Sequence, residues 1–258
     1  MTGLFRAIAD TIAPPDLTCA VCGGERDVLR GFGVCRARAK TLRPLNETVC
    51  VAPNVEAISA FVYEENAAKL VHDLKYGAKG HAAYVLGAFM AARCEDLKRS
   101  DFVVVPVSMH PRRYLSRGFN QSVYLAREVS SRLSLPVCSA LCKTRNTPHQ
   151  TGLDAKSRNE NLTDSWRVKD RAAERIKGRP VLLIDDVRTT GATIRTCAKA
   201  LLSAGASRVL ALTAAGTQKD AERREAFENE AFFAKIIQSK TKVEVAFLRV
   251  QRYNESTA

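Results

Sequence analysis

One segment of thirteen residues, Val181–Thr193, constrains the fold more than any other part of the chain. It reads VLLIDDVRTTGAT and opens with four apolar residues, as does a strand that is buried on both faces of a parallel sheet. Asp185 and Asp186 follow at the end of this strand, where ligands bind in open parallel sheets. A hydroxyl-rich turn then leads into a helix predicted over 192–204. We therefore expect an α/β fold built around this segment.

The turn before this helix has the properties of a phosphate-binding loop. Backbone N–H groups at a helix N-terminus carry partial positive charge and suit a phosphate dianion. Thr189, Thr190 and Thr193 add hydroxyl groups, and Gly191 permits a close backbone approach and a positive φ. The two carboxylates would repel a phosphate, so we expect them to face ribose hydroxyls or a magnesium ion held by the ligand. The alternative is an ordinary strand–turn–helix with a capped helix.

Strands and helices alternate along the rest of the chain, which is typical of a parallel α/β sheet. Short apolar runs predict strands over 57–63, 101–107, 136–141, 166–168, 181–184, 208–214 and 242–250. The spacing of apolar residues predicts helices over 3–13, 64–75, 81–98, 121–133, 192–204 and 218–237. A basic loop is expected over 110–120. The polar stretch 143–161 lacks periodicity, as functional or mobile loops do.

The charge of the chain is strongly positive and unevenly distributed. Forty Lys and Arg stand against 27 Asp and Glu, a formal net charge of +13. Fifteen basic and six acidic residues fall between His110 and Arg179, so +9 of this charge lies in that part of the chain. Such an excess favours polyanions: phosphorylated metabolites, pyrophosphate or nucleic acid. The alternative is an ordinary solvated surface.

The eight cysteines fall into two groups. Four stand singly in apolar or helical surroundings and are expected to be buried: Cys94, Cys138, Cys142 and Cys197. The other four lie near the N-terminus, where Cys19 and Cys22 have the C-x-x-C spacing of a zinc half-site. The predicted structural zinc ligands are Cys19, Cys22, Cys35 and Cys50. The alternative is a decayed site whose remaining thiols are merely buried.

The sequence predicts two domains and no membrane segment. No stretch reaches the roughly 18 apolar residues that a membrane helix requires. Arg6 and Asp10 interrupt the short apolar stretch at the N-terminus, which indicates an amphipathic helix and not a signal peptide. We therefore expect a cytoplasmic protein, with a cysteine-rich module over 1–54 and a larger α/β domain over 55–258.

Four segments together resemble a known family. Val181–Thr193 is similar to the signature of type I phosphoribosyltransferases, which bind 5-phosphoribosyl-1-pyrophosphate. Three further segments resemble the ComF family of competence-associated proteins: LKYGAKG (74–80), VVPVSMHPRRYLSRGFNQS (104–122) and TPHQTGLDAKSRNENL (147–162). Members of that family place a cysteine-rich zinc module before a phosphoribosyltransferase-like domain. The resemblance extends to about Ala215 and implies a type I phosphoribosyltransferase fold.

The resemblance also implies roles for individual residues. Asp185 and Asp186 would hold the ribose hydroxyls at the reaction centre, and Thr189–Thr193 would bind the 5-phosphate. The loop His110–Arg117 would meet the pyrophosphate, and Gln150–Asn161 resembles the mobile loop over the reaction centre. The predicted ligand-binding set is Asp185, Asp186, Val187, Arg188, Thr189, Thr190, Gly191, Ala192, Thr193, Arg112, Arg113 and Arg117. For any single arginine, a structural or surface role is an equal alternative.

The cysteine module departs from the family pattern at one position. The pattern has a second C-x-x-C, but Arg38 stands where the partner of Cys35 would be. Cys50 is the nearest candidate for a fourth thiolate.

The resemblance favours a phosphoribosyltransferase that binds phosphoribosyl pyrophosphate with magnesium and transfers its phosphoribosyl group. The sequence does not identify the acceptor. A link to DNA uptake would make single-stranded DNA a partner, with Tyr114, Phe119 and Tyr124 as stacking residues; the alternative for these aromatics is core packing. Two other functions stay open: a non-catalytic single-stranded-DNA-binding protein that senses the ligand, and a regulator that uses the fold to bind RNA.

Overall fold

The computed structural model describes residues 17–76, 79–144 and 166–218 of the 258-residue chain. Several predicted elements lie outside these residues. They are the helix over 3–13, almost all of the helix over 218–237, the strand over 242–250 and the polar stretch after Thr144, including Gln150–Asn161.

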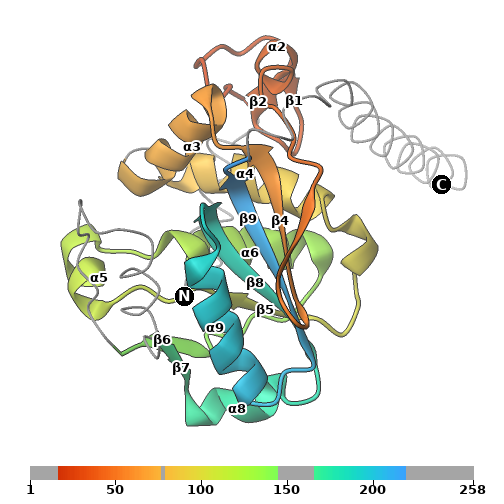
Figure 1. Cartoon of the computed structure of the whole chain (residues 1–258). Helices are drawn as coiled ribbons and strands as arrows, with labels where there is room; N and C mark the ends of the chain where they lie inside the picture. Colours follow the sequence, from red (N-terminus) through yellow and green to blue (C-terminus); the bar gives the residue numbers. More distant parts are fainter. Residues whose placement is uncertain (1–16, 77–78, 145–165, 219–258) are drawn as a thin grey trace, which may run out of the picture.

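A five-stranded sheet forms the centre of the molecule (Figure 1). In sheet order its strands are β3 (Thr48–Ala52), β4 (Val55–Val62), β9 (Arg208–Gly216), β8 (Pro180–Arg188) and β5 (Val103–Pro106). The pairs β4–β9, β9–β8 and β8–β5 are parallel, whereas β3 runs antiparallel to β4 at one edge. The predicted α/β fold class is confirmed, with one antiparallel edge strand added.

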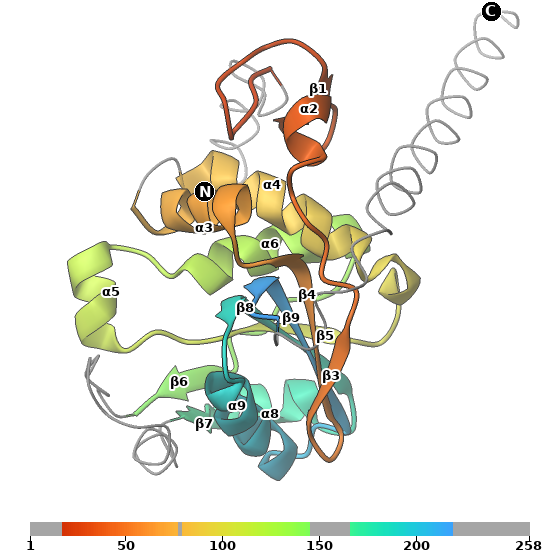
Figure 2. The ribbon, with the colours of Figure 1, turned by 45° about the horizontal axis from the view of Figure 1, so that its top comes forward.

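Helices cover both faces of this sheet (Figure 2). On one face, α3 (Glu65–Tyr76), α4 (Lys79–Ala92) and α6 (Gln121–Leu133) share a core with Leu182 and Leu212 of the strands. On the other, α8 (Asp170–Ile176) and α9 (Ala192–Ser203) pack with the hairpin of β6 (Leu141–Lys143) and β7 (Trp166–Val168). Successive side chains of β8 therefore point into opposite cores, which explains why its apolar run is uninterrupted.

The cysteine-rich region is small and packs on the first of these cores. Its elements are β1 (Val28–Leu29), β2 (Val34–Cys35) and the short helix α2 (Arg36–Ala39). The ring of Phe32 lies 4.7 Å from that of Phe89 on α4, and both rings belong to the same core. The central sheet begins with β3, so it starts on the N-terminal side of the domain boundary predicted after residue 54.

Several predicted elements agree closely with the structure and others do not. The helix over 121–133 has the predicted ends, because Asn120 caps it through a bond from the N–H of Ser122. The helix over 81–98 begins two residues earlier and ends at Ala92, followed by a 3-10 turn at Glu95–Leu97. The prediction of a strand over 136–141 is wrong, because within this segment only Val137 bridges to β5.

Besides α2, two short helices were not predicted. The basic loop over 110–120 contains α5 (Pro111–Arg117), which starts with Pro111 at its first turn and has His110 as its cap. The second is α8, on the far side of the sheet from the cysteine region. Each has seven residues, too few for apolar spacing to define a helical face. Among the helices of the described residues, none is long and apolar enough to cross a lipid bilayer.

Candidate functional site

A cleft of about 300 Å³ lies at the carboxyl ends of β5 and β8, the edge where ligands bind in parallel sheets. Residues from seven segments line it, and most of their side chains are polar. They are Lys75, Tyr76, Val107, Ser108, Met109, His110, Asn120, Gln121, Ser122, Lys143, Trp166, Asp185, Asp186 and Thr193. Both predicted aspartates and one predicted threonine thus face a single cavity.

Asp185 is half-buried and points its carboxylate at the start of α6. Its Oδ1 accepts hydrogen bonds from Ser122 Oγ at 3.1 Å and from the N–H of Asp186 at 3.0 Å. Burial, and secondarily the charge of Asp186, raise the pKa of Asp185 to about 7, against the lowering effect of these bonds and of Lys75. Asp185 therefore changes its protonation state close to neutral pH.

Asp186 is held by a cation. Its Oδ2 lies 2.8 Å from Lys75 Nζ at the end of α3, and its Oδ1 accepts from the N–H of Val187 at 2.8 Å. The side chains of this ion pair are 24% and 19% exposed, so ligands in the cleft can reach both. The two neighbouring carboxylates therefore have different partners: a hydroxyl for the first and an ammonium group for the second.

The turn after β8 has the geometry expected of an anion-binding loop. Gly191 adopts φ +74°, and it precedes α9 as a cap residue without a capping side chain. Within residues 17–76, 79–144 and 166–218, nothing accepts a hydrogen bond from the N–H groups of 190–193. Thr193 lines the cleft, whereas Thr189 and Thr190 are exposed beside it. The turn thus offers bare amide donors next to the aspartates.

Arg188 does not join the cleft with its side chain. It is 7% exposed, and its guanidinium forms a close ion pair with Glu47. Its Nε also donates to Ser59 Oγ at 3.4 Å, and Ser59 in turn shares a hydrogen bond with Thr213 at 2.7 Å. Arg188 as a ligand-binding residue stays a prediction; in the structure its guanidinium ties the end of β8 to Ser59 of β4 and to Glu47.

The three other predicted arginines lie on α5. Arg112 is exposed and is absent from the lining of the cleft, while the side chains of Arg113 and Arg117 lie outside the described part of the structure. Tyr114 on the same helix is 50% exposed. The aromatic pair that follows is packed instead: the rings of Phe119 and Tyr124 meet edge to face at 5.7 Å, and Phe119 is 6% exposed.

Several residues of the cleft were not singled out from the sequence. Lys75, Gln121 and Ser122 fall within the segments that resemble the ComF family, but no individual role followed from them. Trp166 donates from Nε1 to the carbonyl of Ser108 at 3.2 Å, and Lys143 Nζ lies 4.3 Å from the centre of its ring. These residues come from elements far apart in the chain, so local patterns could not have joined them.

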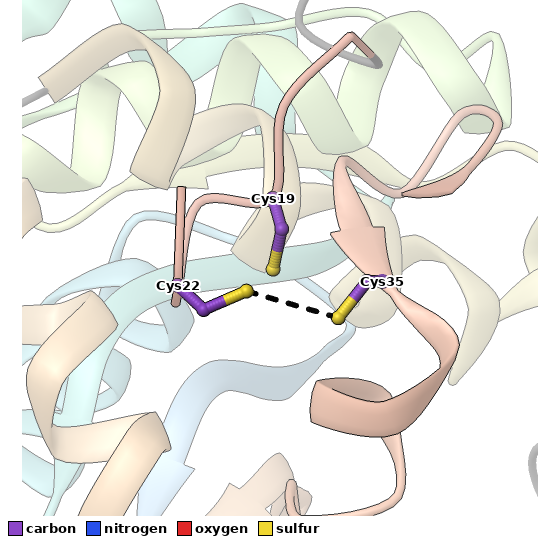
Figure 3. Close-up of side chains that lie close together, drawn as sticks. All are labelled: Cys19, Cys22 and Cys35. Atoms are coloured by element: carbon purple, nitrogen blue, oxygen red, sulfur yellow. Dashed lines mark hydrogen bonds between the residues drawn. The ribbon is translucent and has the colours of Figure 1, made fainter. Parts of the chain in front are cut away.

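Three of the four predicted metal ligands come together (Figure 3). The sulfur atoms of Cys19, Cys22 and Cys35 all lie within 4.8 Å of one another, with Cys22 and Cys35 3.9 Å apart. Two thiolates at 2.3 Å from a tetrahedral zinc ion are about 3.8 Å apart, so the cluster fits such an ion. Cys50 is not part of it: this exposed residue lies on β3 and donates to the carbonyl of Ala52.

The thiols of the cluster differ in their readiness to ionise. A hydrogen bond from the Gly24 backbone, and secondarily one from Cys19, lower the pKa of Cys22 to about 7. Burial raises the pKa of Cys35. Thiolates are the metal-binding form, so Cys22 is the readiest ligand. The prediction that Cys94, Cys138 and Cys197 are buried is confirmed, whereas Cys142 is only half-buried.

Comparison with known proteins agrees with this architecture. The family model of the phosphoribosyl transferase domain matches residues 120–232. DNA utilization protein YhgH of Escherichia coli (strain K12) is 31% identical over 153 residues. The match covers 57% of this chain and 66% of that protein, just under two thirds of its length.

Two further relatives agree with this match. DNA utilization protein YhgH of Salmonella typhimurium is 31% identical over 159 residues, which cover 59% of this chain and 68% of that protein. Competence protein F of Haemophilus influenzae is 32% identical over 120 residues, which cover 46% and 52%. Since these relatives, the matched domain and the sheet with its acidic strand end all agree, this chain belongs to the ComF family and has the phosphoribosyltransferase fold.

Proposed function

We propose that the cleft binds 5-phosphoribosyl-1-pyrophosphate together with magnesium and that the protein transfers the phosphoribosyl group to an acceptor. One observation carries this proposal: the acidic pair Asp185–Asp186 lines the same cavity as Thr193, which ends a turn whose amides bond to none of the described residues. A phosphate needs donors, and ribose hydroxyls need acceptors. The cavity supplies both donors and acceptors at the end of a single strand.

The ligand would lie with its 5-phosphate at the turn 189–193 and its ribose over the acidic pair. Ser122 fixes the carboxylate of Asp185, and Lys75 fixes that of Asp186, so both acceptors are positioned before the ligand arrives. Carboxylate oxygens also suit magnesium, which would stabilise the charge of the pyrophosphate oxygens when bound. The residues present therefore fit both the sugar and its metal ion.

In the transfer, the bond between ribose C1 and the pyrophosphate oxygen breaks, and C1 forms a bond to the acceptor, which loses a proton. Positive charge builds on the ribose and negative charge on the leaving pyrophosphate. Ionised Asp185 and Asp186 would stabilise the former, and Lys75 and Lys143 on the cleft wall would stabilise the latter. Loss of one preorganised contact of this kind raises the barrier by about 3–4 kcal/mol.

A role in the uptake or use of DNA follows from the names of the relatives, which are a DNA utilization protein and a competence protein. A specific feature favours single-stranded DNA as a direct partner: Tyr114 is half exposed on α5, next to the exposed Arg112. An exposed ring beside a cation suits base stacking and a backbone contact. In this second candidate function the protein binds DNA and senses the phosphoribosyl ligand without transferring it.

We also propose that Cys19, Cys22 and Cys35 hold a structural zinc ion, with the fourth position left to a ligand outside this cluster. Metal analysis of the purified protein should find about one zinc per chain. Cys22→Ser should lower that content and the thermal midpoint, whereas Cys50→Ser should change neither. Equal zinc loss in both variants would show that Cys50 is a ligand after all.

The proposed function is tested by calorimetry and by pyrophosphate release. Wild-type protein should bind phosphoribosyl pyrophosphate in the presence of magnesium, and it should release pyrophosphate when a panel of nucleophilic acceptors is added. No binding of the ligand would refute the proposal. Binding without release across the panel, together with salt-sensitive binding of single-stranded DNA, would favour the second candidate function.

A further inference from the structure

A second pocket lies between β7 and α9, on the face of the sheet opposite to the cysteine region (Figure 2). This β7–α9 pocket measures about 330 Å³, and its lining residues are Trp166, Arg167, Val168, Thr196, Lys199, Ala200, Ser203 and Ala204. Of these, Trp166 alone also lines the cleft of the acidic pair. The pocket is therefore a separate site that has one buried ring in common with the cleft.

Two regular elements form the walls of the β7–α9 pocket. Thr196, Lys199 and Ser203 are three and four residues apart on α9, so they lie on the same face of this helix. Arg167 and Val168 of β7 supply the facing wall. The strand is paired with β6, and α9 packs on the central sheet through its buried residues. The lining groups are thus held by ordered backbone on both sides.

The polar groups of the pocket select an anion. Arg167 and Lys199 are its charged residues, and no carboxylate is among the described residues that line it. Guanidinium and ammonium groups both bind phosphate oxygens. The hydroxyl of Thr196 donates to the carbonyl of Ala192 at 3.0 Å, so its oxygen remains able to accept a bond from a ligand. The pocket therefore combines positive charge with hydroxyl groups.

The surface around the pocket favours anions as well. In segments 166–177 and 192–203 every charged side chain is exposed, and seven are basic against two acidic. The basic residues are Arg167, Lys169, Arg171, Arg175, Lys177, Arg195 and Lys199. A surface of one sign raises the local concentration of ligands of the opposite sign. The cleft differs, because it places two carboxylates beside its cations.

The size of the pocket and its apolar side narrow the choice of ligand. Val168, Ala200 and Ala204 line it beside Trp166 and offer no polar side-chain atoms to a ligand. A flat ring that packs there removes apolar surface from water. The volume of about 330 Å³ is near the lower end of the range of small-molecule sites, about 300–1,000 Å³. These properties suit a phosphate joined to one ring system.

We infer that the β7–α9 pocket binds a nucleotide, with its phosphate at Arg167 and Lys199 and its base along the apolar side. A free nucleotide and one nucleotide of a single strand present the same chemistry to the pocket. The site goes beyond the proposed function, because it uses neither the acidic pair nor the turn 189–193. Trp166 is the only tryptophan of the chain, so its fluorescence reports directly on a ligand in the pocket.

The test uses the full-length protein and thymidine monophosphate, whose deoxyribose lacks the 2′-hydroxyl that the acidic pair would hold. Binding should change the emission of Trp166. Arg167→Gln with Lys199→Gln should weaken it at least about tenfold, because two cationic phosphate donors are lost. Thymidine, which lacks the phosphate, should bind the wild type at least about tenfold more weakly than the monophosphate.

A matched control separates the pocket from the general charge of the surface. Arg171→Gln with Arg195→Gln also removes two exposed cations, but neither residue lines the pocket. Affinity for thymidine monophosphate should stay within about threefold in this variant, since salt screens exposed charges at a distance. Equal affinities in the two double variants would overturn the inference, and so would binding that leaves the Trp166 emission unchanged.

Ser203→Leu tests the walls without a change of charge. The exposed position tolerates the larger side chain, which circular dichroism checks, while the pocket becomes narrower. Thymidine monophosphate should bind at least about fivefold more weakly, whereas inorganic phosphate, which is much smaller, should bind as it binds the wild type. Unchanged affinity for the nucleotide would contradict its placement along α9.

Two further probes separate the sources of the nucleotide and the two sites. A short oligothymidylate that binds more tightly than the monophosphate, and loses this affinity with Arg167→Gln and Lys199→Gln, assigns the pocket to a DNA strand; weaker binding assigns it to free nucleotides. Phosphoribosyl pyrophosphate tests the cleft independently. If it does not bind while the nucleotide does, the pocket stands and the proposed function fails. If it binds and neither thymidine compound does, the inference is overturned alone.

Discussion

The two ends of the cleft offer hydrogen-bond donors of different kinds. At the α9 end, the turn 189–193 offers backbone amides, and the side chain of Arg188 before it is turned into the core. At the α6 end, the donors are side chains from separate elements: Lys75 of α3, Gln121 of α6 and Lys143 of β6. The donors at the α9 end come from one contiguous segment, whereas those at the α6 end are brought together by the tertiary structure.

This difference has consequences for how each end can be perturbed. Backbone donors depend on φ and ψ, so they are altered by changes of conformation and tolerate many changes of side chain. Side-chain donors are lost one at a time. The acidic pair belongs to both ends, because Asp185 contacts α6 through Ser122 while its own strand leads into the turn.

Removing the shared acidic pair should have the largest effect. Asp185→Asn combined with Asp186→Asn replaces both carboxylates by neutral amides, and we expect phosphoribosyl pyrophosphate affinity to fall by more than about a hundredfold with the fold intact. Calorimetry and circular dichroism measure the two quantities. Asp170→Asn with Glu174→Gln on α8 changes the charge by the same amount and should leave binding unchanged. Normal binding by the first double variant would show that the site is assigned wrongly.

Breaking the Arg188–Glu47 ion pair should be the next largest perturbation, and it should affect stability. Glu47→Gln leaves a buried guanidinium without its counter-charge, which should lower the free energy of unfolding by about 2–3 kcal/mol in urea titrations. The exposed pair Arg43–Glu64 provides the control, because Glu64→Gln should cost no more than about 0.5 kcal/mol. If Glu47→Gln instead weakens ligand binding tenfold at full stability, Arg188 acts on the ligand and the contrast between the two ends is lost.

Changing the turn glycine should separate backbone recognition from general stability. Gly191→Ala puts a Cβ on a residue at φ +74°, with the nearest side-chain atom, Val51 Cγ1, at 3.7 Å. Gly178→Ala does the same at φ +70° with nothing within 4 Å. Both should lose about 1–2 kcal/mol of stability. Only Gly191→Ala should also weaken ribose 5-phosphate, measured by calorimetry; a similar loss in both variants would argue against the turn as the phosphate site.

The pH dependence of stability should report on the protonation of Asp185. Its pKa, raised to about 7, means that the folded protein holds a proton which the unfolded chain releases near pH 4. The folded state therefore binds more protons between these values, and this contribution to stability is complete at low pH and is lost as the pH rises to 7.

Urea unfolding at successive pH values checks this expectation. Relative to Asp185→Asn, the wild type should lose at most about 1.4 kcal/mol per pH unit between pH 4 and 7, and nothing more above pH 8. Parallel curves for the two proteins would mean that Asp185 ionises at its usual pH, with its bonds to Ser122 and Asp186 outweighing burial.

Much of the fold could be predicted because its signals are local. The buried apolar run before Asp185 identifies β8, and the apolar spacing identifies α6 to the residue at both ends. The strand predicted over 136–141 failed for a reason outside the segment. Apolar residues there pack on the cores, but only Val137 bridges to β5, and strand pairing resumes at Leu141 with β7.

Only the part of the site that comes from one contiguous segment could be predicted from the sequence. The motif supplies Asp185, Asp186 and Thr193, but Lys75 and Gln121 reach the cleft through the order of the strands, which no local pattern encodes. Arg188 belongs to the motif, yet its side chain turns away from the cleft and pairs with Glu47, which lies just before β3. Cys50 illustrates the same limit, since its strand pairs with β4 and carries it away from the other thiols.

The antiparallel strand β3 matters for anyone who wishes to express the sheet domain alone. Its residue Val51 forms a wall behind Gly191, and its backbone covers the outer edge of β4. A shortened chain starting at residue 55 would leave that edge unpaired, and exposed edges invite aggregation between molecules. Shortened versions should therefore start upstream of Glu47, so that they keep both the ion pair with Arg188 and the strand that covers the edge of β4.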